Sequence, residues 1–256
     1  MTQYWFGLTL LLTVAGNMGI VSPINYFLIW ENVKDRFEIW RLLTSFCYAG
    51  KFELPTLMAL YLLMSFSQNY ETSGPFNTGA GGGSADYLFM LLFGAVTMMV
   101  TQPLMNLIVP LSGRLMCRNL IYYVLYIWSK RHPSANANIW GIPVKAIYLP
   151  FVYVIISLFI GAPYIYIIHG ILVGHIYYFL VDVVPHVYGK DVLTTPQFLI
   201  EQLGVGMYVP PAPPAVQPAA AQAGPRVGVA GLGGGAAAPR GGGHDWGHGG
   251  QRLGGT

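Results

Sequence analysis

Residues 86–108 read Asp86-Tyr-Leu-Phe-Met-Leu-Leu-Phe-Gly-Ala-Val-Thr-Met-Met-Val-Thr-Gln-Pro-Leu-Met-Asn-Leu-Ile108. Asp86 is the only charged side chain in this stretch, and about 20 mostly apolar residues suffice for a helix to cross a bilayer. The whole chain has the same character, because 54% of its 256 residues are hydrophobic and 9% are charged, against roughly 25% charged in soluble domains. The stretch predicts a transmembrane helix, and the composition predicts an integral membrane protein.

Similar apolar runs lie on both sides of this stretch. They occupy residues 4–21, 52–69, 114–129, 144–161 and 163–184. The second run, around Leu54–Phe66, and the fourth, around Leu115–Trp128, are shorter than a full bilayer, so neighbouring helices bury them or the bilayer is thinned around them. The predicted fold class is an all-α polytopic membrane protein whose transmembrane bundle has six helices.

The segments between and after these runs have a different composition. Residues 23–50 mix aromatic with charged side chains, which is typical of a segment lying in the membrane interface. Residues 72–84 predict a flexible glycine-rich loop, and residues 130–145 a polar connection. The chain after about Tyr208 consists mainly of Pro, Ala and Gly, too poor in apolar side chains to offset the entropy of folding. We therefore expect a membrane domain over residues 1–200 and a disordered tail over residues 201–256.

Charge and cysteine content argue against several classes of function. The 13 Lys and Arg residues are scattered and the net charge is only +3, which argues against nucleic acid as a partner. Cys47 and Cys117 have no CxxC or Cys/His spacing around them, so we expect no disulfide framework, no metal site and no cofactor. The first apolar run lacks a preceding basic segment and is interpreted as a retained span. The short-loop Lys and Arg count is six on one side and four on the other, which leaves the orientation open.

Two pairs of residues in or beside the spans are candidates for structural roles. Gly170 and Gly174 have the small-xxx-small spacing that lets two helix backbones approach closely. Trp40 and Arg41 end the interfacial segment; an indole anchors at the depth of the headgroups, while a guanidinium binds phosphates or backbone carbonyls.

The ionisable and nucleophilic residues of the spans give weaker signals. His169 and His175 are six residues apart, about 120° apart around a helix, which argues against a shared metal site. Asp182 is a candidate proton-relay carboxylate, but its position near the interface favours a solvated helix end. Ser112, in Pro110-Leu-Ser112-Gly113, is a candidate nucleophile in a sequence that lacks the first glycine of Gly-x-Ser-Gly.

Several blocks in this order resemble the derlin family. They are Tyr4-Trp5-Phe6, Ile39-Trp40-Arg41, Ser84-Ala-Asp86-Tyr-Leu-Phe-Met-Leu-Leu92, Tyr148-Leu-Pro150, Gly170-Ile-Leu-Val-Gly174-His175-Ile-Tyr-Tyr-Phe179 and Thr195-Pro-Gln-Phe-Leu199. Derlins are proteolytically inactive relatives of rhomboid intramembrane proteases and act in endoplasmic-reticulum-associated degradation. The resemblance implies a six-span rhomboid-like bundle in the endoplasmic reticulum membrane, with both termini cytosolic, that helps misfolded proteins reach the cytosol.

The resemblance also bears on whether the chain is an active rhomboid-type protease. Active rhomboids carry His-x-x-Gly-x-x-x-Gly in the sixth span, and this pattern aligned on Gly170 and Gly174 places Ile167 at the position of the histidine. His169 is two residues too late, about 200° away around the helix. We therefore expect no enzymatic activity. An active serine protease remains the alternative, and a small-solute transporter is less favoured because neither repeats nor a buried charge pair is evident.

The end of the tail resembles the SHP box by which derlins bind the cytosolic AAA ATPase called valosin-containing protein. Its candidate binding residues are Trp246, Gly247, Gly249, Arg252, Leu253 and Gly254. An aromatic and an aliphatic anchor separated by glycines can lie extended along a shallow groove. The further partners implied are misfolded substrates, the ubiquitin-ligase complex of the same degradation pathway, the lipid bilayer, and other derlins in homo- or hetero-oligomers.

Overall fold

A computed structural model of the chain describes residues 1–73, 83–108, 115–139 and 142–203. The chain divides into a compact unit, Met1–Pro211, and a second unit, Ala212–Thr256, which lies outside the described residues. The predicted boundary between a membrane domain and a tail, at residue 200, stays a prediction.

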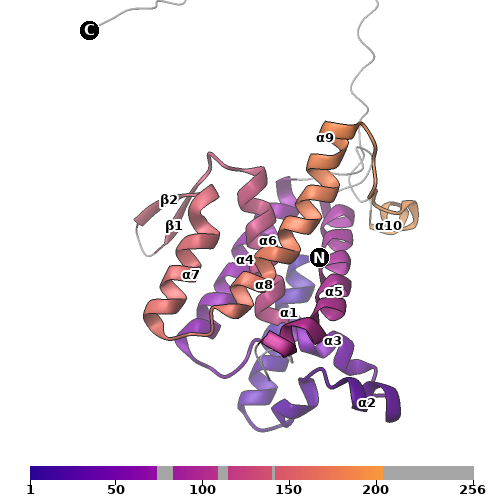
Figure 1. The fold of residues 1–256 in the computed structure, drawn as a ribbon. Coiled ribbons are helices and arrows are strands. Elements are labelled where there is room, and N and C mark those ends of the chain that lie inside the picture. The colour runs from indigo at the N-terminus through magenta and orange to yellow at the C-terminus, as the bar shows by residue number, and fades with distance from the viewer. Residues whose placement is uncertain (74–82, 109–114, 140–141, 204–256) are drawn as a thin grey trace, which may run out of the picture. The chain divides into compact units, whose positions relative to one another are not determined.

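The described part of the first unit consists of helices and one β-hairpin (Figure 1). Its first half contains α1 (Thr2–Asn17), η1 (Pro23–Tyr26), α2 (Trp30–Asp35), α3 (Trp40–Cys47), α4 (Leu54–Ser73) and α5 (Gly83–Ile108). Its second half contains α6 (Cys117–Arg131), β1 (Asn136–Ile139), β2 (Ile142–Lys145), η3 (Ala146–Tyr148), α7 (Leu149–Ile160), α8 (Ile165–Tyr178), η4 (Phe179–Val183), α9 (Val184–Tyr188) and α10 (Gln197–Leu203).

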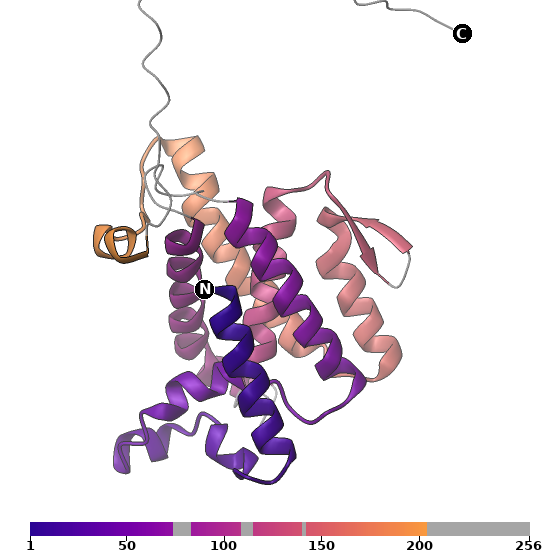
Figure 2. The ribbon, with the colours of Figure 1, turned by 180° about the vertical axis from the view of Figure 1, so that it is seen from behind.

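Helix α6 forms the centre of the bundle. It packs most extensively against α8, and also against α4, α5 and α7; α1 lies beside α4 (Figure 2). Every residue from Asn119 to Ser129 is buried, including tyrosines whose rings fill the space between helices. Because protein rather than lipid surrounds α6, its polar and aromatic composition is compatible with a central position.

Each of the six predicted ranges contains a helix. Two helical segments, Gly83–Leu107 and Ile165–Tyr188, are long and apolar enough by length and composition to cross a membrane, and Ala146–Ile160 is a shorter apolar one. The second predicted run is longer than expected, because α4 continues through the polar residues 67–73 and reaches 20 residues. The fourth is short, as expected: α6 has 15 residues, about 22 Å at the helical rise.

One feature corrects the sequence interpretation, and two add detail to it. The polar connection over residues 130–145 contains an antiparallel hairpin, so the fold is mostly rather than entirely helical. The interfacial segment over residues 23–50 contains two short α-helices, α2 and α3. The last long helix widens into a π-helical turn at Phe179–Val183, a local irregularity common at functional sites.

Candidate functional site

Helix α8 passes close to α6 at Gly170 and Gly174. A Cβ atom at position 170 would lie 2.4 Å from the backbone oxygen of Asn119, and one at position 174 would lie 2.8 Å from Cδ1 of Tyr126. The first obstacle is backbone and cannot rotate away. Gly170 therefore allows α8 to pass α6 at a distance that a side chain would prevent.

The buried side chain of His169 in α8 joins three helices through hydrogen bonds. Its Nδ1 lies 2.7 Å from Nδ2 of Asn119 in α6, and its Nε2 lies 2.8 Å from Oγ1 of Thr101 in α5. With the amide in this orientation, Nδ1 accepts and the Nε2–H group donates. The imidazole thus binds two neighbouring helices, while Ile167, at the position that the rhomboid pattern assigns to the base, is buried and has no titratable group.

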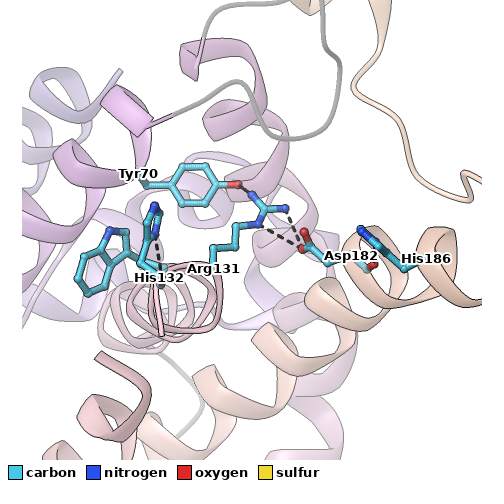
Figure 3. Close-up of polar contacts among 6 residues, drawn as sticks. Tyr70, Arg131, His132, Asp182 and His186 are labelled. Carbon is cyan, nitrogen blue, oxygen red and sulfur yellow. Dashed lines mark hydrogen bonds and ion pairs between the residues drawn. The ribbon is translucent and has the colours of Figure 1, made fainter. Parts of the chain in front are cut away.

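Arg131, Asp182 and Tyr70 form a polar cluster at one end of the bundle (Figure 3). Nη2 and Nε of Arg131 donate to Oδ2 of Asp182, over 2.9 Å and 3.2 Å, and Nη1 donates to the Tyr70 hydroxyl. The Arg131 side chain is only 5% exposed, and that of Asp182 27%. Burial opposes the charge of Arg131, but Tyr70 and Asp182 outweigh that effect and raise its pKa. Asp182 is thus paired with Arg131 rather than only solvated, and the sequence interpretation did not find this ion pair.

Trp40 and Arg41 are adjacent in the sequence, but Arg41 is buried and Trp40 is exposed. Arg41 is buried; its Nη1 donates to the carbonyl oxygens of Ile24, at 2.7 Å, and Phe27, at 3.0 Å, and its Nε donates to Glu38. Trp40 is 56% exposed. Arg41 therefore holds the loop between α1 and α3, whereas the anchoring of Trp40 at headgroup depth stays a prediction.

Two further contacts connect distant segments. The ammonium group of Met1, the backbone N–H of Thr2 and the hydroxyl of Ser84 all bind the Glu71 carboxylate, which brings together the start of α1, the end of α4 and the start of α5. The buried hydroxyl of Thr195 donates to Asp86, at 2.6 Å.

Carboxylates inside predicted spans were the signal for the contacts that the sequence interpretation missed. Asp86 and Asp182 both lie in predicted spans, where an ionisable group needs a partner. Their partners, Thr195 and Arg131, are 109 and 51 residues away along the chain. The spacing of the residues therefore could not identify them.

A cavity of about 360 Å³ lies between α4, α6, α7 and the hairpin. Amide and aromatic side chains line it, including those of Gln68, Asn69, Asn136, Asn138, Trp128 and Tyr153. Such a lining offers hydrogen-bond donors, acceptors and ring faces but no formal charge. It suits a neutral polar ligand rather than an ion.

The candidate tail residues Trp246, Gly247, Gly249, Arg252, Leu253 and Gly254, and the candidate nucleophile Ser112, lie outside the described residues.

Comparison with known proteins identifies the family. The model of the Der1-like family matches residues 1–197. Derlin-1 of Homo sapiens is 36% identical over 223 residues, which cover 82% of this chain and 84% of that protein. Derlin-1 of Arabidopsis thaliana is 32% identical over 188 residues (73% and 67%), and Derlin-1.2 of Zea mays is 30% identical over 199 residues (76% and 78%). The family match takes in the glycines of α8, His169 and the Arg131–Asp182 cluster, and the chain belongs to the derlin family.

Proposed function

We propose that this derlin is a non-enzymatic component of endoplasmic-reticulum-associated degradation that helps misfolded proteins leave the lumen or membrane for the cytosol. Membership of the derlin family implies a role in this pathway and a place in the endoplasmic reticulum membrane. The observation that carries the proposal is the family match over residues 1–197, which takes in every helix from α1 to α9.

The absence of a protease mechanism is supported by the surroundings of α8. Rhomboid chemistry needs a histidine that can take a proton from serine. The aligned position holds Ile167, and His169 already binds Asn119 and Thr101. If Ser112→Ala abolished cleavage of a membrane substrate by this protein, the proposal would have to be replaced by the protease alternative.

We further propose that six spans cross the membrane and that both termini are cytosolic. The tail motif around Trp246 and Leu253 supports this orientation, because its proposed partner, valosin-containing protein, is a cytosolic ATPase. In this arrangement ATP hydrolysis by the partner supplies the pulling force, and the derlin positions the substrate. The cavity between α4 and α7 is the candidate for a laterally open substrate groove.

The role of the tail is tested by capture of valosin-containing protein from a detergent extract. Three baits are compared: the full chain, the chain ending at Gly243, and the Trp246→Ala, Leu253→Ala double variant. We expect capture by the full chain and loss in both altered forms, because each lacks the two apolar anchors. A Val227→Ala, Val229→Ala variant is the matched control, since it removes apolar side chains from the tail outside the motif.

Equal capture by all the baits, or by none, would remove the tail motif from the proposal. The ubiquitin-ligase complex and other derlins are sought in the same eluates, because both are expected to bind the membrane unit and so to remain with the truncated chain.

The functional claim itself is tested in cells that lack the protein. Re-expression of the full chain is expected to restore degradation of a misfolded luminal substrate, and unchanged substrate lifetime would contradict it.

A further inference from the structure

The hairpin beside the polar cavity has two edges with different hydrogen-bonding capacity. Strands β1 and β2 pair in antiparallel register, with Asn136 opposite Lys145, Asn138 opposite Pro143 and Ile139 opposite Ile142. No third strand joins the sheet in the part of the chain that the structure describes. Each strand therefore has one edge that faces away from its partner.

The register determines which backbone groups point outward. The N–H of Ala146 donates to the carbonyl of Ala135 at 2.8 Å, so these residues form a hydrogen-bonded pair. Because such pairs alternate with non-bonded ones along an antiparallel ladder, Asn136 and Asn138 direct their backbone groups away from β2. On β2 the corresponding outward positions are Pro143 and Lys145.

Pro143 makes the two edges unequal. Proline has no N–H group to donate, and proline and lysine at outward positions are common means of preventing a further strand from pairing. The edge of β1 carries no such block, since both of its outward residues are asparagines. Only the β1 edge is suited to pair with another strand.

The cavity adjoins this open edge. All four residues of β1 line it. Side chains alternate between the two faces of a strand, so a cavity that meets four successive residues meets the strand along its edge. Gln68 and Asn69 of α4 stand across the cavity, and the rings of Trp128 and Tyr153 complete the wall.

We propose that this recess binds an extended polypeptide segment, which pairs with the backbone of β1 as a third strand. This proposal rests on the proposed function, for which an unfolded chain is the expected substrate. Backbone pairing and amide side chains recognise peptide groups whatever the sequence, and the neutral lining matches an uncharged backbone. Pairing between the β1 edges of two copies of the chain is the other occupant that this edge could take, and it is an outcome of the test.

The binding test uses the full-length chain in lipid nanodiscs and a fluorescein-labelled nine-residue peptide of alternating Thr and Val. Fluorescence anisotropy is expected to show saturable binding. Asn138→Pro removes one outward N–H without removing a bond to β2, and we expect it to weaken binding roughly tenfold. Asn138→Ala keeps the N–H but lacks the side-chain amide that lines the cavity, so we expect it to weaken binding less than Asn138→Pro does.

A second measurement uses the unaltered chain, so its result does not depend on whether a variant folds. The peptide N-methylated at every residue cannot donate from either edge, and we expect it not to bind the unaltered chain. Equal binding by this peptide, or by Asn138→Pro, would overturn the proposal, as would dimers of the parent chain that Asn138→Pro dissociates. If Asn138→Pro lost peptide binding while the full chain failed to restore substrate degradation in cells, the recess would stand and the proposed function would fall.

Discussion

Arg131 illustrates how a single residue can connect the helices of this bundle. Its guanidinium bonds to the carboxylate of Asp182 and to the hydroxyl of Tyr70, so one side chain joins α6, η4 and α4. Arginine suits this role because its planar head donates in several fixed directions and stays charged at any pH of interest. Its raised pKa has the same cause, the nearby acidic groups.

Removing the charge of Asp182 tests this connection. In Asp182→Asn the guanidinium stays buried without a counter-charge, and we expect a loss of about 1–3 kcal/mol in the free energy of unfolding. Thermal unfolding in detergent measures the loss, and exposed Asp191→Asn is the control. A double Arg131→Met, Asp182→Leu variant should recover most of the stability, because no charge is then buried. Similar transitions in the single variant and the control would mean that the pair contributes little.

Gly170 permits a second residue-scale prediction. In Gly170→Ala the added methyl group would overlap the Asn119 carbonyl, so α6 and α8 must separate, at a cost of about 1–3 kcal/mol. Gly7→Ala is the matched control, since no atom lies within 4 Å of its added Cβ. The two variants are compared by their unfolding temperatures in the same detergent. A stable Gly170→Ala chain would show that the two helices tolerate a wider spacing.

At the scale of elements, the positions of the helices could be predicted from hydrophobicity, but their surroundings could not. The runs around Leu54–Phe66 and Leu115–Trp128 both appeared shorter than a full bilayer. Helix α4 proved longer because a helix can continue through polar residues beyond the bilayer, and α6 proved short but central. The pairing of Asp182 and the contact between Asp86 and Thr195 arise from tertiary packing across long sequence separations. Composition carries no signal for such pairs.

Glu71 connects α1, α4 and α5 and gives an element-scale prediction of pH dependence. Burial opposes its charge, but the Met1 ammonium, Ser84 and Thr2 stabilise the carboxylate and lower its pKa to about 2 from 4.5. A carboxyl with a lowered pKa stabilises the fold fully above its unfolded pKa and loses that effect as the pH falls through the folded value. We therefore expect the unfolding temperature of the parent to fall more steeply between pH 4.5 and 2 than that of Glu71→Gln.

The control for this experiment is Glu201→Gln, which changes an exposed carboxylate of α10. The other carboxylates titrate in all three proteins, so their contribution cancels in the comparison. Parallel pH profiles for parent and Glu71→Gln would show that the contacts of Glu71 do not hold the three helices together.

At the scale of the whole unit, the lengths of the outer helices differ. Helix α5 has 26 residues and α7 has 12, about 39 Å and 18 Å at the helical rise. Side chains of α7 such as Phe151, Ile155 and Phe159 are exposed in the protein and available to lipid. Helix α7 is thus a short helix that lipid can contact, whereas α6 is shielded by its neighbours.

We propose that the bilayer is thinned beside α7, because a short apolar helix is matched by a thinner hydrocarbon core. The protein should then unfold at a higher temperature in vesicles of dimyristoleoyl-phosphatidylcholine than in the longer-chain dierucoyl lipid. Four leucines inserted after Ile155 add about 6 Å to α7 and should reduce that difference, whereas the same insertion after Val96 of the already long α5 should not. Lipid mobility around the reconstituted parent should also exceed that around an unrelated six-span protein. Equal mobility, together with a thickness preference that the α7 insertion leaves unchanged, would show that α7 does not perturb the bilayer, while the family assignment would stand.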